Sequence, residues 1–540
     1  MPVSDLPGGQ LKQTRVRHVV VAICAALSLA PSSFAQVPPL WGALQPGPER
    51  VGFTTVFRFD PERTWARTYD AAGVFVPDSN GRPVQVSVWY PAQATGPCAG
   101  MSFGGAVDVD VVVPPPLTDF ASAMRLRNRE DAHSAVPAER FSELLSSPLH
   151  SCAGAPPSGG DAPLVLYAGG LNASVISNIV LAEFLASHGF AVASVSLVGA
   201  GDAQVTQSRS AIDLEATVRD LEFASTVVRQ LGLARGTRVA VVGHSLGAVA
   251  AMIFAARHGN TRAAIGLDGT YGFEGAGSLL TTGFGYDPTR MRAAVLDIRR
   301  AEGEQEARLD MASVRAMKYA RRDLVAIGAM HHSDFTSFAM VADRFLTPID
   351  PKYAGTRWDR RTGRDGHETT ARLILALLFE TLKADPLARG RFEALARKHE
   401  SVRWAALVAS PLPPSPEETS RLLTTEGLER VKARFRAACA DDAPAGCVDA
   451  ARFNSFGYAL LGKHQVREAI AVLELVAWAH PGLANAQDSL ADAYLAAGDR
   501  ERARRSLQRA IELAPTDASL GPADRERSIS EWTARIRAWP

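Results

Sequence analysis

Between residues 163 and 327, short apolar runs alternate with helical segments, and this alternation constrains the fold more than any other feature of the sequence. Strands that alternate with helices are typical of a parallel, doubly wound sheet that carries helices on both faces. Ligands bind such sheets beyond the carboxyl ends of the strands, so polar residues that directly follow a run are candidates for function. The runs are residues 164–167, 191–197, 238–243, 263–267, 293–298 and 324–327, and the helical segments are 177–188, 212–231 and 246–258.

The run that ends at residue 243 leads directly into a G-x-S-x-G pattern at residues 243–247, and a helix of small and apolar residues follows. Strand, tight turn and helix are the context in which this pattern forms a nucleophile elbow. The serine must adopt a strained backbone conformation there, and the glycines let strand and helix approach closely. We therefore expect Ser245 to be a nucleophile. The alternative is a glycine-rich turn without a chemical role.

A nucleophilic serine of this kind needs two backbone N–H groups to hold an oxyanion. One should come from Leu246, the residue after the nucleophile. The other should come from the loop after an earlier strand, and residues 164–172 fit because a strand is followed by two glycines and Leu171. An ordinary glycine turn is the alternative for this loop.

An acid is expected next along the chain, before the histidine. Asp268 ends the run 263–267, and its carboxylate would orient the imidazole and stabilise its charged form. Asp297 lies within the following run, and Glu302 and Glu304 lie just beyond it, so these three are alternatives.

The last run is followed by two adjacent histidines, His331 and His332. Histidine accepts the proton of a serine because its pKa lies near working pH, so one of the two is the expected base. Adjacent histidines lack the i, i+4 spacing of a helical zinc site, and no metal or other cofactor is expected.

Four segments together resemble the bacterial relatives of platelet-activating-factor acetylhydrolase, also described as dienelactone-hydrolase-like esterases. They are residues 81–91 (GRPVQVSVWYP), 243–247 (GHSLG), 267–268 (LD) and 330–335 (MHHSDF). The resemblance covers residues 50–385 and implies an α/β-hydrolase fold, a Ser-Asp-His triad, no metal and an acyl group of modest size. The family's acid position matches Asp268. Its His-x-x-Phe register selects His332, whereas a register counted from Gly328 allows His331.

The sequence departs from this family in one loop. The family's oxyanion loop usually contains His-Gly, but here residues 169–171 read Gly-Gly-Leu. True dienelactone hydrolases use a cysteine nucleophile, so Ser245 argues against that substrate. The expected activity is hydrolysis of a small-molecule or lipid carboxylic ester through an acyl-enzyme. An amide or lactone hydrolase and an inactive hydrolase fold that serves as a binding scaffold are the alternatives.

The first 35 residues have the pattern of an export signal. Lys12, Arg15 and Arg17 precede a short apolar run, and small residues stand at Ser33 and Ala35. Cleavage after Ala35 would leave a periplasmic or secreted chain with no membrane span; an uncleaved anchor is the alternative. Four cysteines then remain, and export favours disulfides. We prefer the pairs Cys98–Cys152 and Cys439–Cys447, because each lies within one expected domain; free buried thiols are the alternative.

The charge balance excludes two classes of partner. The chain carries 58 basic and 57 acidic residues, a net charge of +1. Such a chain has no overall field that would attract nucleic acid or an anionic membrane.

The C-terminal part predicts a small all-α domain of helical repeats. An offset of 34 residues (515 − 481) links Pro481 with Pro515, Ala469 with Ala503, and Leu461 with Leu495. This period resembles the tetratricopeptide repeat and would offer a surface to a protein partner. The expected organisation is a signal peptide at 1–35, an α/β-hydrolase domain at 36–400, a proline-rich linker and helix at 401–430, and repeats at 431–540.

Residues 100–160 are expected to be mostly irregular, with one helix at 137–145. They follow two predicted strands, 51–59 and 83–90. This insert would lie near a pocket entrance or form a simple excursion.

Overall fold

The computed structural model describes residues 37–65, 67–69, 72–77, 80–96, 98–109, 111–201, 205–281, 285–301, 310–351, 357–398, 400–439 and 444–539. The predicted signal peptide and the two alternative acids Glu302 and Glu304 lie outside these residues.

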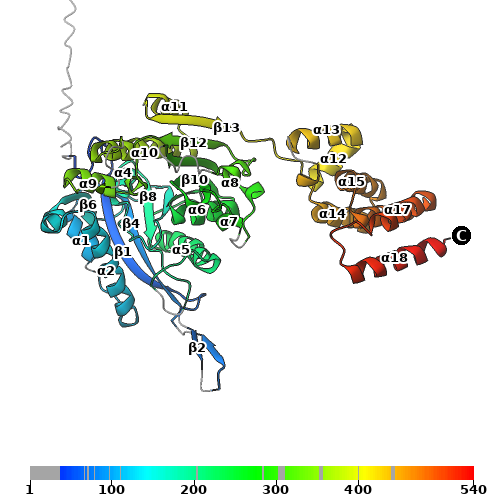
Figure 1. The fold of residues 1–540 in the computed structure, drawn as a ribbon, viewed down its shortest axis with the longest axis horizontal. Coiled ribbons are helices and arrows are strands. Elements are labelled where there is room, and N and C mark those ends of the chain that lie inside the picture. The colour runs from blue at the N-terminus through cyan, green and yellow to red at the C-terminus, as the bar shows by residue number, and fades with distance from the viewer. Residues whose placement is uncertain are drawn as a thin grey trace, which may run out of the picture.

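One sheet of 11 strands organises the described chain between residues 50 and 407 (Figure 1). Its centre is parallel and its strands are almost fully buried, as expected where helices cover both faces. The parallel, doubly wound prediction is thus confirmed. The central strands in spatial order are β8 (Ala191–Val195), β7 (Leu164–Ala168), β9 (Val239–His244), β10 (Thr261–Leu267), β11 (Ala294–Arg300) and β12 (Arg322–Ile327).

The helices form two layers, each with its own apolar core. On one face α5 (Ala211–Gln230) and α6 (Leu246–Arg257) contact the central strands. On the other face α4 (Ile179–Ser187) and α10 (Arg360–Thr381) do so, and α9 (Phe338–Arg344) packs on α10. The carboxyl ends of the parallel strands, where the site is predicted, all lie at one edge of the sheet.

The sheet continues beyond β8 with the two long predicted strands. β4 (Arg82–Ala92) pairs antiparallel with β8, and β1 (Arg50–Asp60) pairs antiparallel with β4. The residues before β1 also belong to this body, because Trp41 is fully buried and its Nε1 donates a hydrogen bond to Glu183, 3.2 Å away. A small hairpin, β2 (Arg67–Tyr69) with β3 (Phe75–Pro77), forms a separate two-stranded sheet.

The prediction that residues 100–160 are mostly irregular is wrong. The segment forms β5 (Ala99–Ser102), α1 (Phe103–Asp108), α2 (Thr118–Ser134), α3 (Phe141–Ser146) and β6 (Pro148–Ala153). The 17-residue helix α2 was missed because its buried face includes Arg127 and Asn128, which weakens the apolar periodicity. β6 pairs with β1, so the insert is part of the main sheet.

The expected domain boundary at residue 400 falls inside the sheet. After α11 (Ala388–Lys398), β13 (Val402–Leu407) pairs antiparallel with the edge strand β12. β13 is a short edge strand in which Val402 and Trp404 are only half-buried, so its strand period is weak. Figure 1 shows that the chain leaves the sheet along this strand and continues toward the C-terminal helices.

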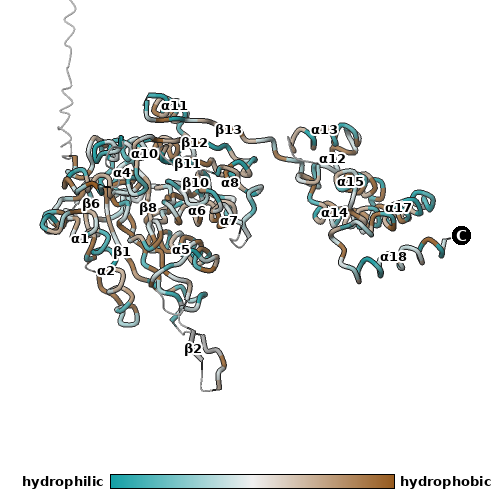
Figure 2. Tube along the Cα trace, in the orientation of Figure 1, coloured by the Kyte–Doolittle hydropathy of each residue, from teal (hydrophilic) through white to brown (hydrophobic). Residues whose placement is uncertain are grey.

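The C-terminal part consists of helices packed in sequence order. α14 (Ala450–Gly462) pairs with α15 (Val466–Ala479), and α16 (Ala484–Ala496) pairs with α17 (Arg500–Leu513). Both helices of the second pair start 34 residues after their counterparts (484 − 450 and 500 − 466). α17 is amphipathic (Figure 2), with its alanines and leucines buried. The flanking helices α12 (Pro416–Glu426), α13 (Leu428–Cys439) and α18 (Pro522–Arg537) cover the ends.

Both predicted cysteine pairs lie at disulfide distance. The Cα atoms are 5.1 Å apart in Cys98–Cys152 and 5.7 Å apart in Cys439–Cys447. Among the residues that the structure describes, no helix is both long and apolar enough to cross a membrane.

Candidate active site

Ser245 stands on the sharp turn between β9 and α6. Its backbone has φ 54° and ψ −120°, a strained conformation for a residue with a Cβ. Its N–H donates to the carbonyl oxygen of Leu267 at 3.0 Å, and its own carbonyl accepts from the N–H of Thr270 at 3.1 Å. The turn is thus held against the end of β10, as the elbow geometry requires.

The two glycines of the motif are needed for space. A Cβ on Gly243 would lie 2.3 Å from the carbonyl oxygen of Gly247, and a Cβ on Gly247 would lie 2.1 Å from that of Gly169. Strand, helix and the loop after β7 therefore meet at distances that only glycine allows.

Asp268 and His332 meet across the site. The Nδ1 of His332 lies 2.6 Å from Oδ2 of Asp268, whose side chain is fully buried. Asp268 directly follows β10, and His332 follows β12, so the sheet topology brings the two together. The Nε2 of His332 has no hydrogen-bond partner among the described residues.

A cation also reaches the same carboxylate. The Nε of Arg300, the last residue of β11, lies 3.1 Å from Oδ2 of Asp268. Burial alone would raise the pKa of Asp268, but the hydrogen bond from His332 and the charge of Arg300 outweigh it and lower that pKa. The carboxylate thus remains ionised and able to hold a charged imidazole.

His244, the second residue of the motif, contacts the loop that carries His332. Its Nε2 lies 2.9 Å from the main-chain oxygen of His332, and the two rings are 4.6 Å apart. Burial and the nearby charge of His332 lower the pKa of His244 to about 3, so its ring is neutral at working pH. A main-chain oxygen only accepts, so Nε2 carries the hydrogen.

The two expected oxyanion donors are open. The N–H groups of Leu171 and Leu246 make no hydrogen bond to any described residue. The loop that carries Leu171 is fixed by its neighbour Asn172, whose side-chain oxygen accepts from the N–H of Gln207 at 2.6 Å. A preformed pair of free donors is what an oxyanion hole requires.

A cavity of about 440 Å³ joins these parts. Ser245 and His332 both line it, and so do His244, Gly170 and Leu171. The volume suits one small ligand. The insert also contributes to the wall: Phe103, Asp131, Ala132, Ser134 and Ala135 line the cavity.

The other candidate residues lie elsewhere. The ring of His331 packs on Trp358, with ring centroids 4.0 Å apart, and His331 does not line the cavity. Asp297 is buried and binds Arg299 and the hydroxyl of Tyr271. Among the described residues, the structure therefore pairs Asp268 with His332, and neither His331 nor Asp297 joins this pair.

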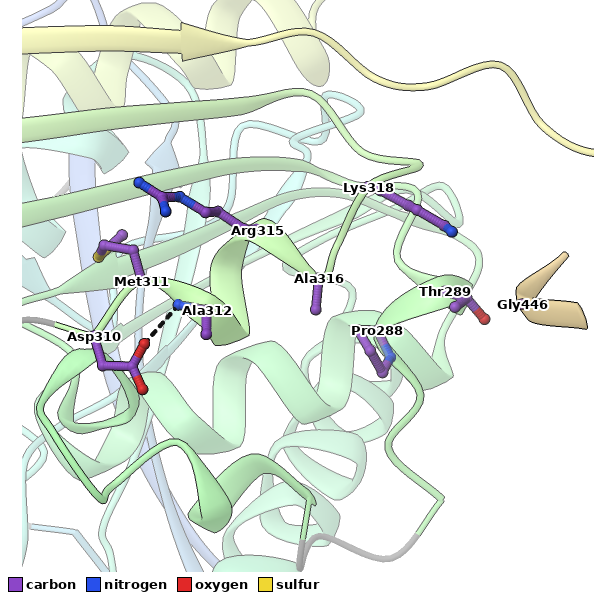
Figure 3. Close-up of a pocket in the computed structure, with 9 residues that line it drawn as sticks. All are labelled: Pro288, Thr289, Asp310, Met311, Ala312, Arg315, Ala316, Lys318 and Gly446. Carbon is purple, nitrogen blue, oxygen red and sulfur yellow. Dashed lines mark hydrogen bonds between the residues drawn. The ribbon is translucent and has the colours of Figure 1, made fainter. Parts of the chain in front are cut away.

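A larger cavity of about 720 Å³ is separate from this site (Figure 3). It is lined mainly by residues from the loops before β11 and β12, together with Gly446 from the C-terminal part. The Asp310 carboxylate there accepts from the N–H of Ala312 at 2.8 Å, as the dashed line in Figure 3 shows. No candidate nucleophile or base lines it. Within the described chain, no group of three or more histidine, cysteine or acidic side chains is placed to hold a metal ion.

Sequence reasoning missed His244, Arg300 and Asp131 as residues of the site. His244 lies inside the motif, but its contact is to a main-chain atom 88 residues away, for which a side-chain pattern gives no signal. Arg300 reaches Asp268 only because β10 and β11 are neighbours in register. Asp131 lies on the helix that was not predicted.

Fold and comparison agree on the class of protein. Residues 163–358 match the family model described as alpha/beta hydrolase fold, and the chain has that fold. Among solved structures, it is similar to a ferulic acid esterase from Streptomyces cinnamoneus, with 22% sequence identity over 66% of this chain and 96% of that chain and a TM-score of 0.44. No curated protein matches the chain in sequence.

Proposed function

We propose that the chain is a serine hydrolase that cleaves carboxylic esters, with Ser245 as nucleophile, His332 as base and Asp268 as the acid that orients it. The observation that carries this proposal is the shared cavity: Ser245 and His332 line it together, and a buried carboxylate 2.6 Å away holds the imidazole. The strained turn at Ser245 supports the same role, because nucleophile elbows store strain of this kind.

In the first half-reaction, the Nε2 of His332 takes the proton of the Ser245 hydroxyl as Oγ bonds to the ester carbonyl carbon. The N–H groups of Leu171 and Leu246 hold the oxyanion that forms. The carbon–oxygen bond to the alcohol then breaks, and the alcohol leaves with the proton from His332. An acyl group remains bound to Ser245.

In the second half-reaction, water replaces the alcohol. His332 takes one proton of the water as its oxygen bonds to the acyl carbon. The bond to Oγ breaks, the proton returns to Ser245, and the free acid leaves. Asp268 stays ionised and stabilises the imidazolium in both halves, and its lowered pKa favours that role.

The proposal also covers the size of the acyl group, the export of the protein and the role of its C-terminal helices. A cavity of about 440 Å³ fits an acyl group of modest size, as the family resemblance implies. The two cysteine pairs fit an exported protein. The helical pairs with their 34-residue offset fit tetratricopeptide-like repeats that bind a protein partner.

Two other functions compete with ester hydrolysis. An amidase or lactonase would use the same residues, and matched ester and amide substrates distinguish them by kcat/KM. A scaffold that binds partners only through its tail would not need the free Leu171 and Leu246 N–H groups or the Asp268–His332 pair. These features favour the enzyme.

The test is hydrolysis of short and long p-nitrophenyl esters by the wild type and by Ser245→Ala, His332→Ala and His331→Ala. We expect the first two variants to lose at least about a thousandfold in kcat, with a small residual rate from the oxyanion donors. His331→Ala is the matched control, because His331 lies outside the cavity, and it should lose far less. Equal losses in both histidine variants, or full activity of folded Ser245→Ala, would contradict the assignment.

A further inference from the structure

The insert places one carboxylate in the wall of the proposed active site. Asp131 lies near the end of α2 and lines the same cavity as Ser245 and His332. Its Oδ2 accepts a hydrogen bond from the N–H of Ser174 at 2.7 Å, which fixes the side chain against the loop that carries Leu171. This side chain is therefore held in a defined place relative to any bound ester.

The hydroxyl of Ser174 also lies close enough to this carboxylate to lower its pKa. Apart from Ser174, no described residue donates a hydrogen bond to Asp131, and the side chain is half-buried. The nearest helical neighbour of opposite charge, Arg127, donates instead to the main-chain oxygens of Leu197 and Val205. No described residue lies within ion-pair distance of Asp131, although the charge of Arg127 acts to lower the pKa of its carboxyl.

A half-buried carboxylate loses part of its hydration when a substrate fills the cavity, and this loss is costly unless the substrate supplies a hydrogen-bond donor. Burial is also the largest influence on Asp131, and it raises the pKa of this group despite the hydrogen bond from Ser174. A substrate donor at this carboxylate would remove that cost, so a substrate that carries one gains binding free energy at this wall.

We propose that Asp131 is a specificity-determining residue that selects esters with a hydrogen-bond donor, an ammonium or hydroxyl group, in the part of the substrate beside α2. This inference rests on the proposed ester hydrolysis. The cavity is small enough that a substrate bound at Ser245 also meets the insert wall.

Another charged side chain in the cavity, Arg209, would favour the opposite substrate charge. Arg209 is exposed, lines the same cavity and forms no ion pair with a described residue. If Arg209 dominated, the enzyme would prefer esters that carry a carboxylate. We favour Asp131 because a hydrogen bond anchors its side chain, whereas Arg209 makes no hydrogen bond or ion pair with a described residue.

The experiment compares four methyl esters of matched size on the full chain by pH titration of the released acid. Methyl butanoate is neutral, methyl 3-hydroxypropanoate carries a hydroxyl, β-alanine methyl ester carries an ammonium, and monomethyl malonate carries a carboxylate. Propyl acetate and 2-hydroxyethyl acetate repeat the neutral and hydroxyl arms on the alcohol side. Wild type, Asp131→Asn and Arg209→Gln are measured, and Ser245→Ala is the blank.

We expect the wild type to prefer a donor-bearing ester over its neutral partner at least tenfold in kcat/KM, and Asp131→Asn to lose most of that ratio. Whichever ester shows the larger preference in kcat/KM, the hydroxyl ester or the ammonium ester, identifies the preferred donor. A wild type without any donor preference overturns the inference even if Asp131→Asn fails to fold. A preference for monomethyl malonate that Arg209→Gln abolishes also overturns it. In both cases hydrolysis that depends on Ser245 leaves the proposed function standing, whereas Ser245-independent hydrolysis removes both.

Discussion

The Nε2 of His244 donates a hydrogen bond to the main-chain oxygen of His332 across 2.9 Å, and so links the turn of Ser245 to the loop of the proposed base. His244 precedes Ser245 directly, so any shift of the base loop away from the serine must break this bond or move the turn. The neutral ring of His244, with its pKa lowered to about 3, keeps the donor in place over the working pH range.

We therefore predict that His244→Leu lowers kcat about tenfold, because one hydrogen bond that positions the base is lost. His244→Gln should retain most of the activity, since its amide nitrogen replaces Nε2 as donor. The measurement is kcat and KM for a p-nitrophenyl ester, with the far-ultraviolet circular dichroism of each variant as the check on folding. Equal kcat in folded His244→Leu and the wild type would show that the bond does not position the base.

A second prediction concerns the pH dependence of stability. Burial raises the pKa of Asp334 to about 6, although its carboxylate accepts hydrogen bonds from the N–H of His331 and Nε1 of Trp358. Since this pKa is higher in the folded than in the unfolded chain, the contribution of Asp334 is present at low pH and is lost as the pH rises through about 6.

From about pH 5 to about pH 7.5, this carboxyl should cost about 1 kcal/mol of the free energy of unfolding. Asp334→Asn keeps both acceptor contacts and cannot ionise, so its stability should fall less over the same range. The measurement is chemical denaturation of both proteins at each pH. The same pH slope in both would mean that Asp334 does not titrate in this range.

The sequence predicted the centre of the sheet well, because each parallel strand is buried on both faces and reads as an apolar run. The edges were harder. β13 is short and only half-buried on its inner face, and α2 buries Arg127 and Asn128, so both carry only a weak hydrophobic period.

For the site, the chain order of serine, acid and histidine gave the candidates, and the topology brings Asp268 to His332. The sequence alone could not choose between His331 and His332, because neighbouring residues differ only in the direction of their side chains. In the structure one ring meets Asp268 and the other meets Trp358. Contacts to main-chain atoms or between neighbouring strands, such as those of His244 and Arg300, leave no local pattern.

A third prediction compares the two cysteine pairs. Cys98 and Cys152 are 54 residues apart in sequence, whereas Cys439 and Cys447 are 8 apart. In the loop-entropy description, the longer loop contributes about 4 kcal/mol and the shorter about 2.5 kcal/mol. Replacing the first pair by serines should therefore destabilise its part of the chain more than replacing the second destabilises the helical part. Thermal unfolding of the two double variants and the wild type checks this order, and the reverse order would contradict it.

If His332 activates Ser245, the serine should react with a fluorophosphonate probe. Such probes form a stable adduct only with an activated serine. We predict that the wild type is labelled, that peptide mapping places the adduct on Ser245, and that His332→Ala is labelled at least about a hundredfold more slowly while His331→Ala is labelled at nearly the wild-type rate. A folded wild-type protein that stays unlabelled, or an adduct on another residue, would contradict the account.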